Sequence, residues 1–396
     1  MSTDFLSERI NNMATSATLA MAAKARELKA EGRDIIGLSL GEPDFNIPDF
    51  IKEAAKEAID QNYSSYSPVD GYADLKQAIA NKFKRDNNLD YGLDQIVVST
   101  GAKQSLANVA MAMINEGDEV VLPAPYWVSY SDIVKLAGGV PVEVPTSIDT
   151  DFKMTAQQLE DAITPKTKML WFSSPCNPSG SVYSKEELES LAAVLRNHPG
   201  IFVVSDEIYE HINFTGGHVS IAAIEGMYDR TITVNGVSKA FAMTGWRIGF
   251  IGAPAWIAKA TNKFQGQVTS GANSIAQRAT IAALEAPKEK IQYMIDEFHK
   301  RRDLVLGLLG EIEGFNLNIP EGAFYVFPDI SSFFGKTIDG MQINNASDFS
   351  LFLLEKANVA TVTGEAFGNP NCIRISYAAS EAELKEAIAR IKKALS

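Results

Sequence analysis

The chain has 396 residues, in which 36 lysines and arginines stand against 49 aspartates and glutamates, giving a formal net charge of −13. A chain of this length favours two or more domains with a large core. Its negative charge argues against sequence-independent nucleic-acid binding, which depends on cationic side chains that neutralise phosphates.

Targeting and redox signals point to an ordinary intracellular protein. The first residues are polar and lack the apolar stretch of a signal peptide, and no apolar run reaches the roughly eighteen residues of a membrane helix. The chain has two cysteines, Cys176 and Cys372, far apart in sequence, which favours a reducing compartment. Its four histidines show no metal-binding spacing, so we expect a structural role for each. These features predict a cytoplasmic protein without a bound metal.

Strand and helix patterns alternate over the first two thirds of the chain. We expect early helices over 14–31, 49–61 and 72–87, with a short strand between the first two over 35–40. Further strands are expected over 95–99, 119–122, 168–173, 201–205, 231–234 and 248–251. Helices follow several of these strands, one of them opened by a capping box at 184–187. This order predicts a mostly parallel sheet covered by helices on both faces.

The pattern changes near residue 290. A helical region runs from about 275 to 313 with a break at Ala286-Pro287, and short strand candidates follow over 322–327, 359–362 and 372–377. The last helix carries Leu384, Ile388, Ile391 and Leu395 at spacings that place one apolar stripe on a core. We therefore expect a domain boundary near residue 290.

Polar and glycine-rich residues gather just after the strands. In open α/β sheets, ligands bind outside the carboxyl ends of the strands. We therefore expect one crevice to collect Gly101, Ala102, Lys103, Tyr126, Trp127, Asn177, Asp206, Tyr209 and Lys239.

The cofactor of such a crevice is indicated by its residue types. The chain contains no G-x-G triplet for a dinucleotide, and the Gly101 loop lacks the spacing of a P-loop. Lys239 is able to form a Schiff base once deprotonated, and Arg247 is able to grip a phosphate. With an acid and aromatic plates nearby, this set suits pyridoxal phosphate. The alternative is a surface lysine and arginine that flank a turn.

Asp206 is the candidate acid for the ring nitrogen of that cofactor. At an effective dielectric near 20, opposite charges 4 Å apart attract by about 4 kcal/mol. That energy corresponds to about three pKa units in favour of a protonated pyridine. The alternative is an ordinary acid that caps a helix at the end of a strand.

The segment from Ser238-Lys239 through Gly245, Arg247 and Gly249 resembles the cofactor-attachment signature of class I aminotransferases, the fold type I aspartate aminotransferase superfamily. Asp206 precedes Lys239 by 33 positions (239 − 206), as this family expects. The resemblance covers essentially the whole chain, from 41–44 to 374–377.

The resemblance implies an α/β fold. A large domain over 47–290 would hold a mostly parallel seven-stranded sheet between helices. A smaller α/β domain over 291–396 would be joined by the N-terminal segment 1–46.

The resemblance also implies roles around the cofactor ring. Lys239 would hold the internal aldimine and shuttle the proton between substrate and cofactor. Asp206 would pair with the pyridine nitrogen, Asn177 and Tyr209 would bond the phenolic oxygen, and Trp127 would stack on the ring.

Further implied roles concern the phosphate, the substrate and a second subunit. The phosphate would lie at the helix start after Gly101, near Ala102, Lys103, Ser238 and Arg247. Tyr66 resembles the tyrosine that reaches the phosphate of a neighbouring subunit, which implies a homodimer with shared sites. Arg374 would clamp the substrate α-carboxylate, with Gly41, Trp127 and Asn177 lining the same pocket.

Two positions depart from the best-studied branch of the family. Gly236 replaces a phosphate-binding serine, for which Ser238, Thr244 or backbone amides could substitute, and no arginine stands in 265–270 to read a distal carboxylate. The segments 16–18 and 126–130 resemble instead a second, bacterial and thermophile branch. We therefore expect Lys103 to bind the distal carboxylate, while a mobile segment around Ser16 and Thr18 closes over the substrate.

The resulting prediction is an aspartate aminotransferase that exchanges the amino group of L-aspartate with 2-oxoglutarate through ping-pong half-reactions. The alternative within the family is an aromatic or glutamate/aspartate-prephenate aminotransferase. A lyase or decarboxylase on the same scaffold is a further possibility. A regulatory module that binds pyridoxal phosphate is disfavoured, because the chain leaves no room for a DNA-binding domain and is acidic. Acceptor preference and assembly beyond a dimer stay open.

Overall fold

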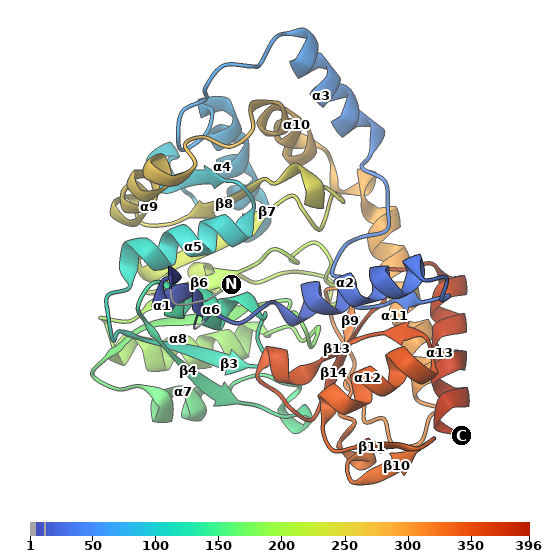
Figure 1. The fold of residues 1–396 in the computed structure, drawn as a ribbon. Helices are drawn as coiled ribbons and strands as arrows, with labels where there is room; N and C mark the ends of the chain where they lie inside the picture. Colours follow the sequence, from blue (N-terminus) through green and yellow to red (C-terminus); the bar gives the residue numbers. More distant parts are fainter. Residues whose placement is uncertain (1–4, 12) are drawn as a thin grey trace.

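The computed structural model describes residues 5–11 and 13–396, and a seven-stranded sheet dominates it (Figure 1). The strand order is β2-β8-β7-β6-β5-β3-β4. The strands are β2 (Ile96–Ser99), β3 (Glu119–Ala124), β4 (Val140–Pro145), β5 (Thr167–Ser173), β6 (Phe202–Asp206), β7 (Thr231–Gly236) and β8 (Gly249–Gly252). β8 runs antiparallel to both β2 and β7, while the other neighbours are parallel. The seven-stranded, mostly parallel sheet predicted from the sequence is thus confirmed.

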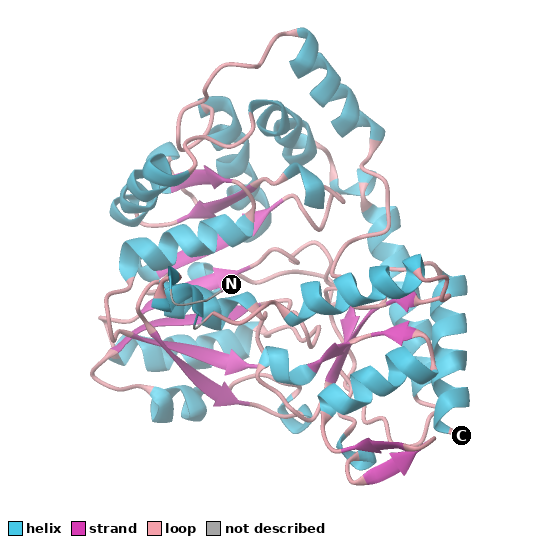
Figure 2. Cartoon of the chain, in the orientation of Figure 1, coloured by secondary structure: helices cyan, strands magenta, loops and turns pink. Residues whose placement is uncertain are grey.

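Alternate residues of each strand enter different cores on the two faces of this sheet. On β5, for example, Met169 and Trp171 pack in one hydrophobic cluster, whereas Leu170 and Phe172 pack in another. Both faces are buried because helices cover both, as Figure 2 shows. The helices are α3 (Asp49–Asp60), α4 (Ala73–Asn87), α5 (Ala102–Met113), α6 (Ser129–Leu136), α7 (Ala156–Ala162), α8 (Lys185–Asn197), α9 (Ala255–Val268) and α10 (Ser274–Glu285).

The capping box predicted at the start of α8 is confirmed. The hydroxyl of Ser184 accepts a hydrogen bond from the Glu187 amide at 3.2 Å, and the Glu187 carboxylate accepts one from the Ser184 amide at 2.7 Å. Two amides that the helix itself leaves without partners are satisfied in this way.

The C-terminal part forms smaller sheets with its own core. A three-stranded sheet has the order β13-β14-β9, and separate pairs join β1 with β12 and β10 with β11. These strands are β1 (Ile36–Gly37), β9 (Tyr325–Val326), β10 (Lys336–Ile338), β11 (Met341–Ile343), β12 (Val359–Ala360), β13 (Val362–Thr363) and β14 (Ile373–Ser376). The accompanying helices are α11 (Gln292–Leu309), α12 (Ala346–Lys356) and α13 (Glu381–Leu395), and the N-terminal ones are α1 (Glu8–Asn11) and α2 (Ala17–Ala30).

The N-terminal segment joins this C-terminal part. β1 pairs in parallel with β12, and α2 lies beside β12 and β13 (Figure 1). The guanidinium of Arg33 donates to the Leu354 carbonyl and to the Asn358 side chain, at 3.0 and 2.8 Å. Segments more than 300 residues apart in sequence are therefore packed together.

Several predicted bounds were wrong in this region. The strand expected over 35–40 is confined to Ile36–Gly37, because its neighbour β12 offers two residues for pairing. The strand expected over 322–327 is confined to Tyr325–Val326. The helical region predicted to reach 313 ends at Leu309, and its break falls as expected between Glu285 and Gln292, around Pro287. In the described part of the chain, no helix is long and apolar enough to cross a membrane.

Candidate active site

A cavity of about 400 Å³ lies at the carboxyl ends of β5, β6 and β7. Each of these strands delivers polar side chains to it: Ser173 ends β5, Asp206 ends β6, and Ser238 and Lys239 follow β7. The cavity collects most residues that the sequence singled out, namely Gly41, Ala102, Lys103, Trp127, Asn177, Asp206, Tyr209, Ser238, Lys239, Arg247 and Arg374. Ser16 and Thr18 line it as well.

Three residues that the sequence placed at the site lie outside the cavity lining. Gly101 lies directly behind it, in contact with Arg247. Tyr66 lies on the loop between α3 and α4 and is 99% exposed. Tyr126, expected in the same crevice, was wrongly placed by the sequence argument: its hydroxyl donates to the Glu143 carboxylate at 2.5 Å, away from the cavity. Trp127 therefore lines the cavity, whereas Tyr126 does not.

Lys239 offers an amine that deprotonates easily. Its Nζ donates to the carbonyl of Gly41 at 2.5 Å and lies 5.8 Å from the ring centroid of Tyr209. Burial, together with the positive charge of Arg374, lowers the pKa of Lys239 to about 8. A neutral amine is therefore accessible near neutral pH, as nucleophilic chemistry requires.

Asp206 is a buried acid with few donors. Its Oδ2 accepts from the Tyr130 hydroxyl at 2.7 Å, and its Oδ1 accepts from the Ile208 amide at 3.2 Å. Burial raises the pKa of Asp206 to about 6 in spite of these hydrogen bonds. A cation placed against this carboxyl would lower its pKa again, so the site favours a positively charged partner.

Tyr130 is a site residue that the sequence argument missed. Burial raises the pKa of Tyr130 well above its usual value, so its hydroxyl remains a donor to Asp206. The ring of Tyr130 also packs edge-on against Trp127, at 5.6 Å between centroids. The only signal in the sequence is that Tyr130 follows Trp127 by one helical turn.

Arg374 forms one positive pole of the cavity. Its Nη1 donates to Asn177 Oδ1 at 2.9 Å and its Nη2 to the Ser39 carbonyl at 2.6 Å, and its Nε is buried without an acceptor among the described residues. The guanidinium lies 4.5 Å from the ring centroid of Tyr325, whose hydroxyl is 2.8 Å from that of Tyr209. A buried cation with neutral neighbours is suited to bind an anion.

The second positive pole lies at the start of α5. Gly101, with φ +84°, precedes the helix without a side chain of its own to cap it. A Cβ atom at Gly101 would collide with the guanidinium of Arg247, so only glycine permits this approach. Free amides at a helix start and an adjacent arginine form a site for a phosphate.

Lys103 stands near this second pole. Its Nζ lies 4.7 Å from the ring centroid of Trp127. Burial, and then the charge of Arg247, lower the pKa of Lys103. The segment 265–270, by contrast, does not reach the cavity, because Gln265 is buried and donates to the carbonyls of Val69 and Val98 at 2.6 and 2.8 Å.

Comparisons with known proteins agree with this geometry. Residues 33–391 match the family described as aminotransferase class I and II.

The chain belongs to the class I and II aminotransferases.

This aminotransferase is similar along nearly its whole length to several named relatives. It is 50% identical over 391 residues to the aspartate/prephenate aminotransferase of Cereibacter sphaeroides, covering 98% of each chain. Among solved structures, it is 46% identical to the aspartate aminotransferase of Rhizobium meliloti, with a TM-score of 0.95 and 98% of each chain covered. It is 41% identical to that of Thermus thermophilus with maleate, with a TM-score of 0.92 and 98% and 99% covered. The fold type I architecture and the thermophile-like branch predicted from the sequence are confirmed.

Aminotransferases of this family depend on pyridoxal phosphate, and the cavity of this aminotransferase fits that cofactor. The uncapped start of α5 beside Arg247 suits its phosphate, and the raised pKa of Asp206 suits its protonated ring nitrogen. The lowered pKa of Lys239 suits reversible attachment to its aldehyde. The orphaned Nε of Arg374 leaves a donor for the carboxylate of a substrate.

Proposed function

We propose that this aminotransferase transfers the amino group of L-aspartate to 2-oxoglutarate, giving oxaloacetate and L-glutamate. The observation that carries the proposal is the set of cations around Lys239. Arg247, Arg374 and Lys103 all line one cavity, and none of them forms an ion pair with a carboxylate in the described part of the chain. One phosphate and the two carboxylates of a dicarboxylic substrate would give each of these three cations an anionic partner.

Pyridoxal phosphate, when bound, supplies an aldehyde that links reversibly to amines and a ring that withdraws electrons from the reacting carbon. We propose that Lys239 holds the cofactor and then, as a neutral amine, moves the proton of the substrate α-carbon. Asp206 keeps the ring nitrogen protonated. Asn177 and Tyr209 bond the phenolic oxygen, and Trp127 stacks on the ring.

The phosphate and the substrate use the two positive poles. We propose that the amides of Ala102 and Lys103, the hydroxyl of Ser238 and the guanidinium of Arg247 hold the phosphate behind Gly101. Arg374 binds the substrate α-carboxylate through parallel hydrogen bonds, next to Gly41. The ammonium of Lys103 binds the distal carboxylate. Ser16 and Thr18 close the opening over the substrate.

A second candidate substrate is prephenate. The observation that favours it is the relative of Cereibacter sphaeroides, named aspartate/prephenate aminotransferase, together with a bifunctional relative of Petunia hybrida at 48% identity. Prephenate also carries two carboxylates, so the same cations would serve it. A panel of acceptors, in which 2-oxoglutarate, prephenate and aromatic 2-oxo acids compete for one amino donor, separates the candidates.

The organisation of the chain is part of the proposal. We propose a large domain over 47–290 and a small domain over 291–396 that the segment 1–46 joins, which the pairing of β1 with β12 supports. We further propose a homodimer in which Tyr66, exposed in the single chain, reaches the phosphate site of the partner. A cytoplasmic location is supported by the free, buried Cys176 and Cys372.

The experiment that tests the function is an absorbance titration of the purified protein. We expect a visible band of lysine-bound cofactor that L-aspartate alone abolishes and that 2-oxoglutarate restores. A band that responds only to aromatic amino acids would keep the fold and overturn the substrate. A protein that shows no visible band after pyridoxal phosphate is added would refute the role of Lys239.

A further inference from the structure

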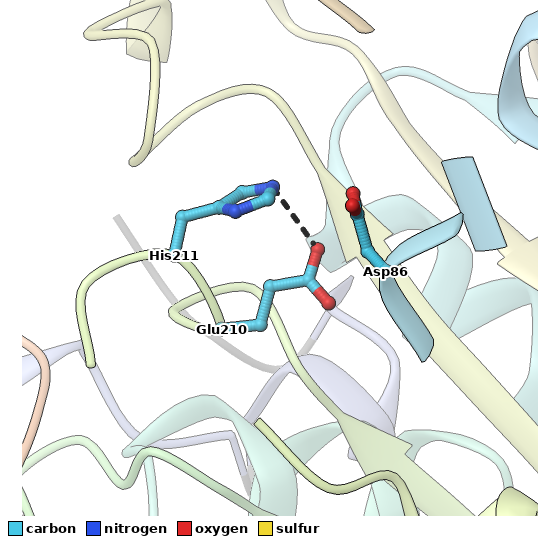
Figure 3. A group of neighbouring side chains, drawn as sticks. All are labelled: Asp86, Glu210 and His211. Carbon is cyan, nitrogen blue, oxygen red and sulfur yellow. Dashed lines mark ion pairs between the residues drawn. The ribbon is translucent and has the colours of Figure 1, made fainter. Parts of the chain in front are cut away.

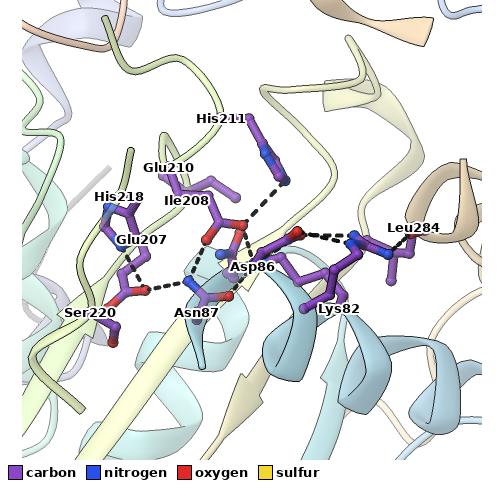
Figure 4. A network of polar contacts seen from close by, with 12 residues as sticks. Lys82, Asp86, Asn87, Glu207, Ile208, Glu210, His211, His218, Ser220 and Leu284 are labelled. Atoms are coloured by element: carbon purple, nitrogen blue, oxygen red, sulfur yellow. Dashed lines mark hydrogen bonds and ion pairs between the residues drawn. The ribbon is translucent and has the colours of Figure 1, made fainter. Parts of the chain in front are cut away.

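The turn that follows β6 has a second face, which the proposed reaction does not use. Asp206 and Tyr209 face the cavity, whereas Glu207 and Glu210 point into a buried group of polar side chains behind it (Figure 4). We call this group the Glu207 network, defined by Lys82, Asn87, Glu207, Glu210 and His218. Four of its members are buried, and the fifth, His218, has a side chain that is 6% exposed. Solvent therefore does not screen their charges.

Glu207, the residue that follows Asp206 in the chain, makes several polar contacts in this network. Its Oε1 accepts from the hydroxyls of Ser205 and Ser220, at 2.9 and 2.6 Å. Its Oε2 lies 2.9 Å from Nε2 of His218 and also accepts a longer bond of 3.4 Å from Asn87. The carboxylate is thus fixed from several sides, directly next to Asp206 in the chain.

Lys82 supplies the positive charge that pairs with Glu210 in the rest of the network. The ammonium of Lys82 pairs with Oε1 of Glu210 and donates to Asn87 Oδ1 at 2.6 Å, while Asn87 Nδ2 donates to Glu210 Oε2 at 2.7 Å. Since Lys82 occupies the space between these oxygens, the network is held together by an ammonium rather than arranged around a metal ion.

The two histidines at the network behave differently. His211 lies 3.3 Å from Glu210 Oε1 and close to Asp86 (Figure 3), and burial lowers the pKa of His211 to about 4 in spite of that carboxylate. Burial alone would lower the pKa of His218 as well, but the Glu207 carboxylate outweighs it and the pKa of His218 is raised. The Glu207 carboxylate thus favours the protonated form of His218, which would balance Glu207 as Lys82 balances Glu210.

We propose that His218 is a positioning residue for the reaction: through Glu207, its imidazolium sets the charge that surrounds Asp206 and hence the proton affinity of the bound cofactor. The inference rests on the proposed role of Asp206. The charged groups that act on His218 are Glu207, Glu210 and Lys82, and the groups that act on Asp206 are Tyr130, Glu207 and Lys239.

The electrostatic argument has a definite sign. Glu207 adds to the burial that raises the pKa of Asp206. Removing the positive charge of His218 leaves the negative charge of Glu207 uncompensated, so nearby groups bind protons more tightly. Removing the charge of Glu207 also removes the group that favours the protonated form of His218, so both charges are lost and the balance stays close to that of the wild type. Removing both restores the original balance.

The experiment is a pH titration of the visible band of the holoenzyme, together with thermal unfolding. We expect His218→Gln to raise the midpoint of the band by about half a unit or more, since a nearby charge moves a pKa by up to about 1–3 units. Glu207→Gln should move the midpoint less, because His218 then loses the carboxylate that favours its protonated form. The double variant should return the midpoint toward that of the wild type. His198→Gln, which breaks a surface histidine pair with Glu160, and Ser220→Ala, which removes a neutral donor to Glu207, should leave the midpoint unchanged.

A structural role alone would lower the thermal stability of both single variants without raising the midpoint of His218→Gln above that of Glu207→Gln. A midpoint of His218→Gln that stays at the wild-type value, or that the double variant does not bring back, would overturn the inference while the band itself still supports the proposed function. If the variants do not fold, ¹⁵N spectra of the wild-type histidines decide: a neutral His218 at pH 7 also overturns it. A wild type without a visible band would instead refute the proposed function.

Discussion

Asp206 and Glu210 are two carboxylic acids of one turn whose surroundings drive them in opposite directions. Both residues are 5% exposed, yet burial raises the pKa of Asp206 to about 6, whereas Lys82 overcomes burial and lowers the pKa of Glu210. The difference lies in which group supplies the cation next to each carboxylate. The chain supplies one for Glu210, while Asp206 faces a cavity and leaves that position to a ligand. Burial alone therefore does not mark a functional acid. The better candidate is a buried acid that faces a cavity and is not paired with a cation from the described part of the chain.

Lys82→Met removes the ammonium that pairs with Glu210 in the Glu207 network, and we expect it to have the largest effect on stability. It leaves Glu210 buried without its ammonium, which costs about 3–5 kcal/mol for a broken buried ion pair. Denaturant unfolding at one fixed protein concentration measures the loss. In the wild type, the pairing of Glu210 contributes stability that is fully present above about pH 4.5 and is lost as the pH falls toward the lower folded-state pKa. A loss below about 1 kcal/mol would contradict the buried pair.

Asp206→Asn removes the carboxylate that faces the cavity, and we expect it to lower activity rather than stability. A carboxylate at about 4 Å from the ring nitrogen contributes at most about 4 kcal/mol, so we expect kcat to fall by about 10²- to 10³-fold. Single-turnover kinetics with L-aspartate measure the loss, and the unfolding temperature should not fall, because the variant removes an acid that burial disfavours. Activity within tenfold of the wild type would show that Asp206 is only a structural acid.

The two sides of the turn were not equally predictable from the sequence. Asp206 and Lys239 were recognised because they lie at or just after the end of an apolar strand, and Arg374 because its segment resembles that of the family. Lys82 and Asn87 gave no signal, because they lie on α4, more than 100 residues from the glutamates that they contact. The position of β8 was equally hidden, since strand order depends on long-range packing. The sequence thus indicated residues that line the cavity, and missed residues that contact one another behind it.

Lys103→Ala should change substrate discrimination. The ammonium lies over Trp127 and pairs with no carboxylate among residues 5–11 and 13–396, which leaves it available for the distal carboxylate of aspartate. A charged contact is worth about 1.5–3 kcal/mol, which predicts a fall of about 10- to 200-fold in the preference for aspartate over alanine, measured as kcat/KM. An unchanged preference would assign the distal carboxylate to another residue.

The pH dependence of cofactor attachment should reveal the lowered pKa of Lys239. Only the neutral amine attacks the aldehyde, so the rate at which apoenzyme gains the visible band should rise about tenfold per pH unit below pH 8 and then level off. The plateau begins near the pKa of about 8 that burial and Arg374 impose. A rate that keeps rising toward pH 10 would mean that Lys239 behaves as an exposed lysine.

Lys84→Met is the matched control for Lys82→Met and should have the smallest effect. Lys84 lies on the same helix and pairs with Asp90 at 3.1 Å, but the two side chains are 67% and 79% exposed. Water screens such a pair, and its loss costs about 0.2–1 kcal/mol. Both variants remove one lysine charge from α4, so any difference between them in the free energy of unfolding reports burial and the unpaired carboxylate. Equal losses would mean that the Glu207 network is open to water, and the contrast between Glu210 and Asp206 would then need another cause.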